Sequence, residues 1–401
     1  MNRTFPILLA FLLAPLAMLH AASYHLDAEG GTDDGDGLTP ATAWRSLAKA
    51  SAFTFQPGDR LLLKAGSSWT GQLHPLGSGS AEHRITLDRH GKGAKPVIHG
   101  GGIASGAVLL ENQERWSIRN LKVTNQGSPA PKKMGILIRN NAVGTLSGIE
   151  VKDCDIHDVV GDLADYRDGK ESGGIVFCED VIFQSNEVCE TKTKFDGMAF
   201  DFDNSNQRCI YQYNYSHDNE GGFLNMCCDG KANGNIVRYN VSQNDGCLAG
   251  SRVFLVHGHG NHNYQVYNNT IYVRNGNPAM FEQGADSSES LITFQNNIFI
   301  NAGSGTFLAP KGCQFERNLY FGSGHIEADG KKILADPRLP SPGSGRIGLD
   351  SVDGYKLVAG SPALDAGVLI KDNGGRDYWG KAVSATASSH LGAFNGRAIQ
   401  R

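Results

Sequence analysis

The amino-acid sequence predicts an all-β fold, a parallel β-helix in which short strands wind into stacked coils. Three observations predict this fold. A β-rich segment that ends in Asn or Asp recurs along the chain, a second strand-like segment lies between successive copies, and 51 glycines in 401 residues favour many turns over long helices.

The first recurring segment places an Asn or Asp at the same point of each copy. These positions are Asn120, Asp155, Asn186, Asn214, Asn240, Asn269, Asn297 and Asn318, at intervals of 21 to 35 residues. A single coil cannot bury its apolar side alone, so we expect the coils to stack about 4.8 Å apart. Asn suits a fixed bend in such a stack, because its amide can hydrogen-bond along the stack and it tolerates left-handed backbone angles.

The second recurring segment completes each coil. Its copies cover residues 135–140, 174–179, 197–203, 222–227, 252–257 and 279–283. An offset of 18 residues relates the starts of three copies, Gly222, Ser251 and Ala279, to the Asn that follows each of them. This constant offset predicts which residues of neighbouring coils lie side by side.

The two ends of the chain differ from the repeats. In residues 1–22, Arg3 precedes an apolar run over 5–19 that is too short and too interrupted by proline for a spanning helix, which is typical of a secretory signal peptide. We expect residues 23–330 to form the β-helix with its N-terminal cap, and 331–401 to form a C-terminal capping segment. The protein is predicted to be secreted (periplasmic, extracellular or at the cell surface), without a transmembrane segment, and monomeric.

The amino-acid composition limits the classes of partner that we expect this protein to bind. The formal net charge is -4, and the chain has no basic block or basic/aromatic array, so a nucleic-acid partner is not expected. The eight cysteines contain no Cys-x-x-Cys pair, which argues against a zinc site of the usual spacing. An even number of cysteines in an exported protein permits disulfides, but the pairing cannot be read from sequence.

The sequence resembles secreted right-handed parallel β-helix proteins, the pectate-lyase-like and polygalacturonase-like group. The resemblance begins at residues 31–69, where a Gly/Asp loop and a short helix precede the first strand. It continues in the tail segments 334–339, 355–367, 376–380 and 390–396. It implies a right-handed β-helix with an N-terminal capping helix and an irregular C-terminal cap. Because this fold supports lyases, hydrolases, epimerases and adhesive proteins, it implies a carbohydrate-active protein without choosing the reaction.

The acidic strand at residues 197–203 is the first candidate for chemistry. Alternate residues of a strand point the same way, so Phe200 and Phe202 should fill the interior while Asp201 and Asp203 face outward. Their Cβ atoms would lie about 7 Å apart. That separation is at the low end of the range for the acid and base of an inverting glycosidase, roughly 6.5–9.5 Å. A solvated acidic strand is the structural alternative.

Neighbouring coils extend this face. Aligned by the offset, Asn225, Arg252 and Glu282 should follow Asp201 on successive coils, flanked by Phe223 and Phe254. Polar groups beside flat apolar surfaces suit a sugar ligand. We therefore expect Asn225, Phe223, Phe254 and Glu282 to bind substrate, and Arg252 to be among the catalytic residues.

The turn at residues 214–222 leads into the same layer. It carries His217, a candidate for substrate binding, and Asp218 and Glu220. Glu220 is either a further catalytic carboxylate or, with Asp196 and Asp218, part of a Ca²⁺ site built from oxygen ligands. The stretch is loosely similar to calcium-binding segments of some β-helix lyases, although the following coil carries Arg252 where a lysine would be expected.

His257 opens a run with three histidines in six residues. Its Gly-His-Gly core resembles a polygalacturonase signature, but the accompanying Asn-Thr-Asp and Arg-Ile-Lys signatures are absent. The run therefore has two possible functional roles: it binds a metal ion, or one of its histidines assists proton transfer near Arg252.

These sequence features support three alternative functions. The first is a polysaccharide-degrading glycoside hydrolase that uses paired outward carboxylates and requires no cofactor. The second is a Ca²⁺-dependent polysaccharide lyase that uses Arg252 or a histidine as its base. The third is a surface β-helix that binds glycans without catalysis.

Overall fold

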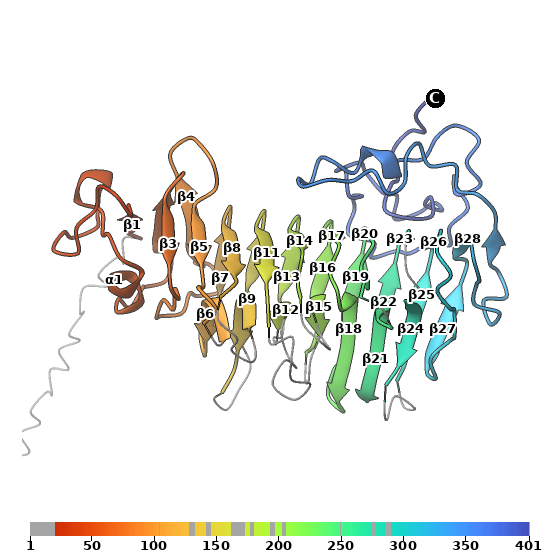
Figure 1. Ribbon diagram of the computed structural model, residues 1–401, viewed down its shortest axis with the longest axis horizontal. Coiled ribbons are helices and arrows are strands. Elements are labelled where there is room, and N and C mark those ends of the chain that lie inside the picture. Colours follow the sequence, from red (N-terminus) through yellow and green to blue (C-terminus); the bar gives the residue numbers. More distant parts are fainter. Residues whose placement is uncertain are drawn as a thin grey trace, which may run out of the picture.

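The computed structural model describes residues 21–103, 105–127, 133–141, 146–161, 173–176, 180–192, 197–202, 206–248, 250–274, 278–284 and 290–400. The predicted residues Asp196 and Asp203 and the predicted signal peptide through residue 20 lie outside these ranges. The chain forms a parallel β-helix whose coils follow one another along the long axis of the molecule (Figure 1).

Three parallel sheets make up the walls of the solenoid. Among the described residues, sheets A and B contain eleven strands each and sheet C contains seven. Sheet A consists of β1 (Ser23–Leu26), β2 (Arg60–Lys64), β4 (Ile85–His90), β7 (Trp116–Arg119), β10 (Glu150–Lys152), β13 (Ile182–Gln184), β16 (Ile210–Gln212), β19 (Ile236–Arg238), β22 (Tyr264–Tyr267), β25 (Ile292–Gln295) and β27 (Cys313–Glu316). Sheet B consists of β3 (Ser68–Thr70), β5 (Val97–His99), β8 (Lys122–Asn125), β11 (Asp155–Val159), β14 (Glu187–Cys189), β17 (Tyr215–His217), β20 (Val241–Gln243), β23 (Thr270–Val273), β26 (Ile298–Asn301), β28 (Leu319–Gly322) and β29 (Ile333–Leu334). Sheet C consists of β6 (Ser105–Glu111), β9 (Lys133–Arg139), β12 (Gly173–Val176), β15 (Met198–Phe202), β18 (Gly222–Asp229), β21 (Arg252–His259) and β24 (Ala279–Gln283).

The predicted asparagine ladder forms the bend between sheets A and B. Each ladder Asn donates its side-chain N–H to the Asn Oδ1 of the next coil, and the same Oδ1 accepts the backbone N–H of the preceding Asn. The members are Asn186, Asn214, Asn240, Asn269, Asn297 and Asn318, each at most 1% exposed, with N···O distances of 2.9–3.2 Å. The carboxylate of Asp329 ends the ladder by accepting both N–H groups of Asn318.

The ladder differs from the sequence prediction in three respects. Asn120 lies outside it, because its backbone has a left-handed φ of 55° and its Nδ2 donates to Asp88 Oδ1. Cys154, and not Asp155, occupies its first described position, because the Cys154 N–H donates to Asn186 Oδ1. Asp155 instead begins β11 and forms an ion pair with Lys95. The left-handed backbone angle lies one residue before the ladder Asn, as at Tyr213 (φ 58°) and Tyr239 (φ 52°).

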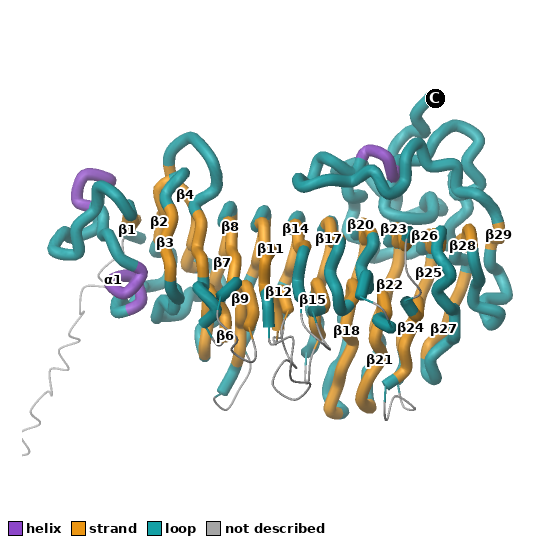
Figure 2. The backbone as a smooth tube through the Cα atoms, viewed as in Figure 1, coloured by secondary structure: helices purple, strands orange, loops and turns teal. Residues whose placement is uncertain are grey.

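Apolar side chains from all three sheets fill the interior, and short segments close its first coil. The expected N-terminal helix is a five-residue helix, α1 (Leu47–Ser51), preceded by a 3-10 turn, η1 (Pro40–Thr42). Ser46 caps α1 by accepting the N–H of Lys49, and Leu47 packs into the core. Figure 2 shows how little helix the molecule contains.

The C-terminal segment folds back over the outside of sheet B. After β29 (Ile333–Leu334), its only helix or strand within the described residues is a 3-10 turn, η3 (Asp353–Tyr355), and the segment lies above β20, β23, β26 and β28 (Figure 1). Tyr355, Leu391 and Phe394 pack against outward residues of sheet B such as Val241 and Tyr272. This contact buries the outer face of sheet B from β17 onward, whereas it does not cover the outer face of sheet C.

Two further observations complete the architecture. None of the helices among the described residues has the length and apolar character that crossing a bilayer requires. Six cysteines within the described ranges are free thiols: Cys154, Cys189, Cys209, Cys227, Cys247 and Cys313.

Candidate active site

Asp201 lies on the outer face of sheet C. Its neighbours in β15, Phe200 and Phe202, point into the core and are fully buried. Asp201 is paired in register with Asn225 of the next coil, and Asn225 Nδ2 donates to Asp201 Oδ1 at 2.7 Å. The carboxylate is therefore held in one orientation by a neighbouring coil. Both side chains are largely buried, with exposures of 4% and 6%.

Asn225 also has an unused acceptor. Its Oδ1 is buried and has no hydrogen-bond partner among the described residues. A buried carbonyl oxygen without a donor is costly unless a ligand or water supplies one. The amide thus orients Asp201 on one side and offers an acceptor on the other.

The predicted row of outward residues is wrong at the third coil. Asp201 and Asn225 are followed by Leu255 and then Glu282, so Leu255 stands where we expected Arg252, which lies three residues earlier. The turn after β21 is one residue shorter than the turn after β18, since Asp229 pairs with His259 whereas Ile236 pairs with Gln265. The offset of 18 residues does not hold for that coil.

Arg252 is instead the first residue of β21 and pairs with Ala279. Its guanidinium still reaches the next coil, where Nε lies 3.8 Å from Glu282 Oε2. The Arg252 side chain is mostly buried and that of Glu282 is 43% exposed. Arg252 lies at the end of sheet C where the strands begin, and Glu282 lies further along, in register with Leu255.

Phe223 and Phe254 do not flank the site. Both are fully buried core residues, with ring centroids 5.5 Å apart, and cannot contact a substrate. Phe254 faces inward because of the shifted register. Phe223 lies just after Gly222, whose φ of 140° turns the chain sharply into the strand, so the two-residue alternation begins only beyond this corner.

His217 is not part of this face either. It belongs to β17 of sheet B, where its ring is buried beneath the C-terminal segment. Nε2 lies 3.1 Å from Glu187 Oε1 and Nδ1 lies 2.9 Å from Asp218 Oδ2. Burial alone would lower the pKa of His217, but the hydrogen bonds to Asp218, Cys189 and Glu187 raise it. This imidazolium stabilises the contact between sheet B and the C-terminal segment, and a substrate cannot reach it.

The predicted calcium ligands are divided by the structure. Asp218 is tied to His217 on sheet B, and Asp196 lies outside the described residues. The described part of the chain contains no group of three or more His, Cys, Asp or Glu side chains placed to bind a metal ion. Calcium binding therefore stays a prediction.

Glu220 lies in the turn just before β18. It is half-buried, and burial raises the pKa of its carboxyl group, partly offset by Lys192. A raised pKa favours the protonated form that a general acid needs. Glu220 and Asp201 occupy different places along the coil, because Asp201 is level with Asn225, five residues beyond Glu220.

His257 lies in the next outward row of sheet C. It pairs with Cys227, whose Sγ lies 3.4 Å from His257 Nδ1. On the other side the ring covers Gly284, where an added Cβ would come within 2.1 Å of His257 Cδ2. The imidazole is therefore held between two coils at a half-exposed position near Asn225.

Comparison with known proteins places these features in context. No protein-family model matches the chain. Its sequence is similar to a lacto-N-biosidase of Bifidobacterium longum, with 33% identity over an alignment of 238 residues. The alignment covers 51% of this chain and 14% of that protein, so the chain spans only a small part of the length of the curated relatives it matches.

Two solved structures share the fold. Pectate lyase Pel9A has a TM-score of 0.63 at 13% identity, covering 94% of this chain and 96% of that chain. The GH136 lacto-N-biosidase of Eubacterium ramulus has a TM-score of 0.53 at 16% identity, covering 79% of this chain and 67% of that chain. The resemblance to β-helix proteins of the carbohydrate-active group is thereby confirmed at the level of the fold.

Sequence reasoning missed two features of the outer surface. One is the burial of His217, for which no local signal exists. The other is a row of polar side chains on sheet A, Gln265, Thr293 and Gln314, which occupies alternate positions of three recurring segments. The alternation of polar and apolar residues in those segments was the available signal.

Proposed function

We propose that the chain is an exported enzyme that cleaves glycosidic bonds by hydrolysis. The observation that carries this proposal is the buried carboxylate of Asp201, fixed by Asn225 on the outer face of sheet C. The sequence similarity to a lacto-N-biosidase supports the same reaction class. Export is proposed from residues 1–22 of the sequence.

In this proposal Asp201 works with a second carboxyl group. Asp203 follows two residues later, and strand alternation predicts that it faces the same way, about 7 Å away. One acid protonates the leaving oxygen while the other activates water, which is the arrangement of inverting glycosidases. Glu220, whose pKa is raised by burial, is the alternative proton donor.

The remaining outward residues are proposed to bind substrate. Asn225 Oδ1 can accept a sugar hydroxyl, and the half-exposed Glu282 lies further along the same row. His257 lies one row away and could assist either by hydrogen bonding or by proton transfer. Because hydrolysis by paired carboxylates requires no metal ion, we expect activity in the presence of a chelator.

Replacing Asp201 or Asp203 with Asn tests the assignment. Each substitution should lower turnover by roughly 10²–10⁴-fold, because proton transfer by a positioned acid or base contributes about that factor. Turnover is measured by mass spectrometry on a panel of neutral and acidic polysaccharides. Asp34→Asn, an exposed site on the N-terminal loop, is the matched control and should keep wild-type activity.

The same assay separates hydrolysis from elimination. Hydrolysis adds the mass of water to the products, whereas a lyase yields an unsaturated uronate that absorbs near-ultraviolet light. Wild-type turnover in both Asp variants, with unchanged melting temperature, would reject their catalytic roles. Unsaturated products that disappear with chelator would replace the hydrolase proposal by the calcium-dependent lyase.

A further inference from the structure

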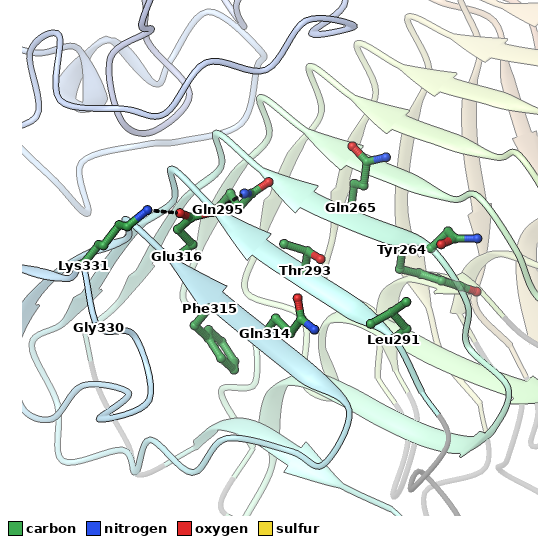
Figure 3. A pocket seen from close by; sticks show the side chains of 11 residues that line it. Tyr264, Gln265, Leu291, Thr293, Gln295, Gln314, Phe315, Glu316, Gly330 and Lys331 are labelled. Carbon is green, nitrogen blue, oxygen red and sulfur yellow. Dashed lines mark hydrogen bonds and ion pairs between the residues drawn. The ribbon is translucent and has the colours of Figure 1, made fainter.

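A cavity of about 690 Å³ lies on the outer face of sheet A (Figure 3). It extends over β22, β25 and β27, the last strands of that sheet, and is bounded at one end by Gly330 and Lys331. Asp201 belongs to another wall of the solenoid, sheet C. The cavity is thus separate from the proposed catalytic face.

A row of polar side chains forms the floor of this cavity. Gln265, Thr293 and Gln314 pair directly with one another in register on three successive coils. The two glutamines are exposed and Thr293 is half-buried. None of these three side chains has a hydrogen-bond partner among the described residues. Their spacing equals the coil repeat, about 4.8 Å.

The adjacent row is already paired and carries no net charge. Gln295 Nε2 donates to Glu316 Oε2 at 2.8 Å, and Lys331 Nζ donates to Glu316 Oε1 at 2.5 Å. The hydrogen bonds from Lys331 and Gln295 hold the pKa of Glu316 below its usual value. Glu316 is therefore an ionised acceptor without a proton to donate, and the cavity is suited to binding and not to acid catalysis.

Leu291 adds an exposed apolar side chain to the cavity lining. It is 40% exposed, whereas Tyr264 and Phe315, which also line the cavity, are buried (Figure 3). Amides and a hydroxyl that both donate and accept, next to the exposed side chain of Leu291, match the hydroxyl and C–H groups of a sugar ring. The balanced charge of Glu316 and Lys331 favours a neutral ligand over a polyuronate.

A second cavity, of about 350 Å³, is lined by side chains that already have partners. It is lined by Tyr213, Arg376 and Trp379, among others. The Arg376 guanidinium lies 4.1 Å from the centre of the Tyr213 ring, and Trp379 Nε1 donates to Asp353. Because these side chains already contact other residues of the protein, we interpret this cavity as a gap where the C-terminal segment packs against the β-helix.

We propose that the row Gln265–Thr293–Gln314 is a non-catalytic binding surface for a neutral glycan chain that lies along the solenoid axis. Successive sugar units would meet successive coils, since the coil repeat is close to the length of one pyranose ring. The choice of a glycan as ligand rests on the proposed function, whereas the location of the surface does not. Such a surface would hold a long substrate while sheet C cleaves it.

The test uses the full-length mature protein carrying Asp201→Asn, so that binding is measured without turnover. The probes are cellohexaose, xylohexaose and a β-1,4-galactan hexaose, with hexagalacturonate as the anionic comparison, by isothermal titration calorimetry. At least one neutral probe should bind. Adding Gln265→Ala and Gln314→Ala together should weaken that binding roughly tenfold or more. Thr293→Arg, which places a bulky cation in the middle of the row, should weaken binding at least as much, while binding at sheet C is unchanged.

The matched control is Gln56→Ala, an exposed glutamine in the N-terminal region. It should bind as the parent protein does, and all variants should keep the parent melting temperature. Parent-like binding by both sheet A variants overturns the proposal, as does failure of every neutral probe to bind. Equal binding of hexagalacturonate overturns the preference for a neutral ligand.

The outcomes also separate this proposal from the proposed function. Binding that is lost in the sheet A variants, with no cleavage by the wild-type chain, would retain the surface and reject the hydrolase. Cleavage of short substrates that is unchanged in the sheet A variants, with weaker binding of hexasaccharides, would support both.

Discussion

At the scale of single residues, the direction of a side chain decides its role. Asp201 and His217 are both polar residues in buried strands, yet Asp201 faces the outside of sheet C and His217 lies beneath the C-terminal segment. His217 is held between Glu187 and Asp218, so removing it would leave Glu187 as an unpaired buried charge. Its contribution is structural.

Asp245 gives a residue-scale prediction for pH dependence. It is buried at the bend between sheets B and C, where Ser216, Ser242 and Asn219 donate to its carboxylate. Burial raises the pKa of Asp245 to about 6, against the lowering effect of these hydrogen bonds. Because the folded state binds the proton more tightly than the unfolded chain, this group's stabilisation is full below about pH 4 and is lost as the pH rises through about 6.

Asp245→Asn should remove that dependence. The stability of the variant relative to wild type should increase between pH 4 and pH 7 by on the order of 3 kcal/mol. Urea unfolding at several pH values measures the difference, and Asp34→Asn provides an exposed control. A difference that stays constant over this range would contradict the assignment.

At the scale of elements, the asparagine ladder fixes the register between coils. At this bend, strand pairing leaves some backbone N–H and C=O groups without partners. Each Asn side chain hydrogen-bonds to such groups on two coils, and the ladder is fully buried. Its final acceptor is Asp329, which joins the last strands to the segment that follows them. The repeat spacing made the ladder positions from Asn186 onward predictable.

Asn240→Ala tests the ladder. The substitution removes the acceptor of the Asn214 backbone and side-chain N–H groups and the donor to Tyr211 O. We expect a loss of about 3–5 kcal/mol in the free energy of unfolding, because each buried polar group left without a hydrogen-bond partner costs about 1–3 kcal/mol. Gln56→Ala, at an exposed position outside the ladder, should change it by less than about 0.5 kcal/mol. Equal midpoints of chemical denaturation in the two variants would contradict this role.

At the scale of the whole molecule, the C-terminal segment covers the outer face of the later strands of sheet B, from β17 onward. Tyr355 is its central contact: it is fully buried, and its hydroxyl donates to Gln243 Oε1 at 2.8 Å. The backbone N–H of Gly348 bonds to Glu187, a residue 161 positions earlier in the chain. Stability of the last coils therefore depends on residues that are distant in sequence.

Tyr355→Ala should loosen this segment first. Truncating a buried aromatic residue costs about 3–5 kcal/mol, and the segment has little regular structure to hold it in place otherwise. Limited proteolysis followed by mass spectrometry should show faster cleavage between residues 335 and 400. Leu369→Ala, at an exposed position, should leave the cleavage rate unchanged. Faster cleavage within the β-helix, with the C-terminal segment intact, would contradict the prediction.

The sequence by itself determined the stacked-coil fold, the ladder from Asn186 to Asn318 and the outward direction of Asp201. Each of these follows from a local period, because strand alternation and the spacing of the bends are written into neighbouring residues. Only the tertiary structure decided the rest. One shorter turn shifted Phe254 from the outward row to the core, Arg252 lies three residues before its expected position, and the return of the C-terminal segment buried His217. Those outcomes depend on turn lengths and on contacts between residues far apart in the chain, which no local pattern encodes.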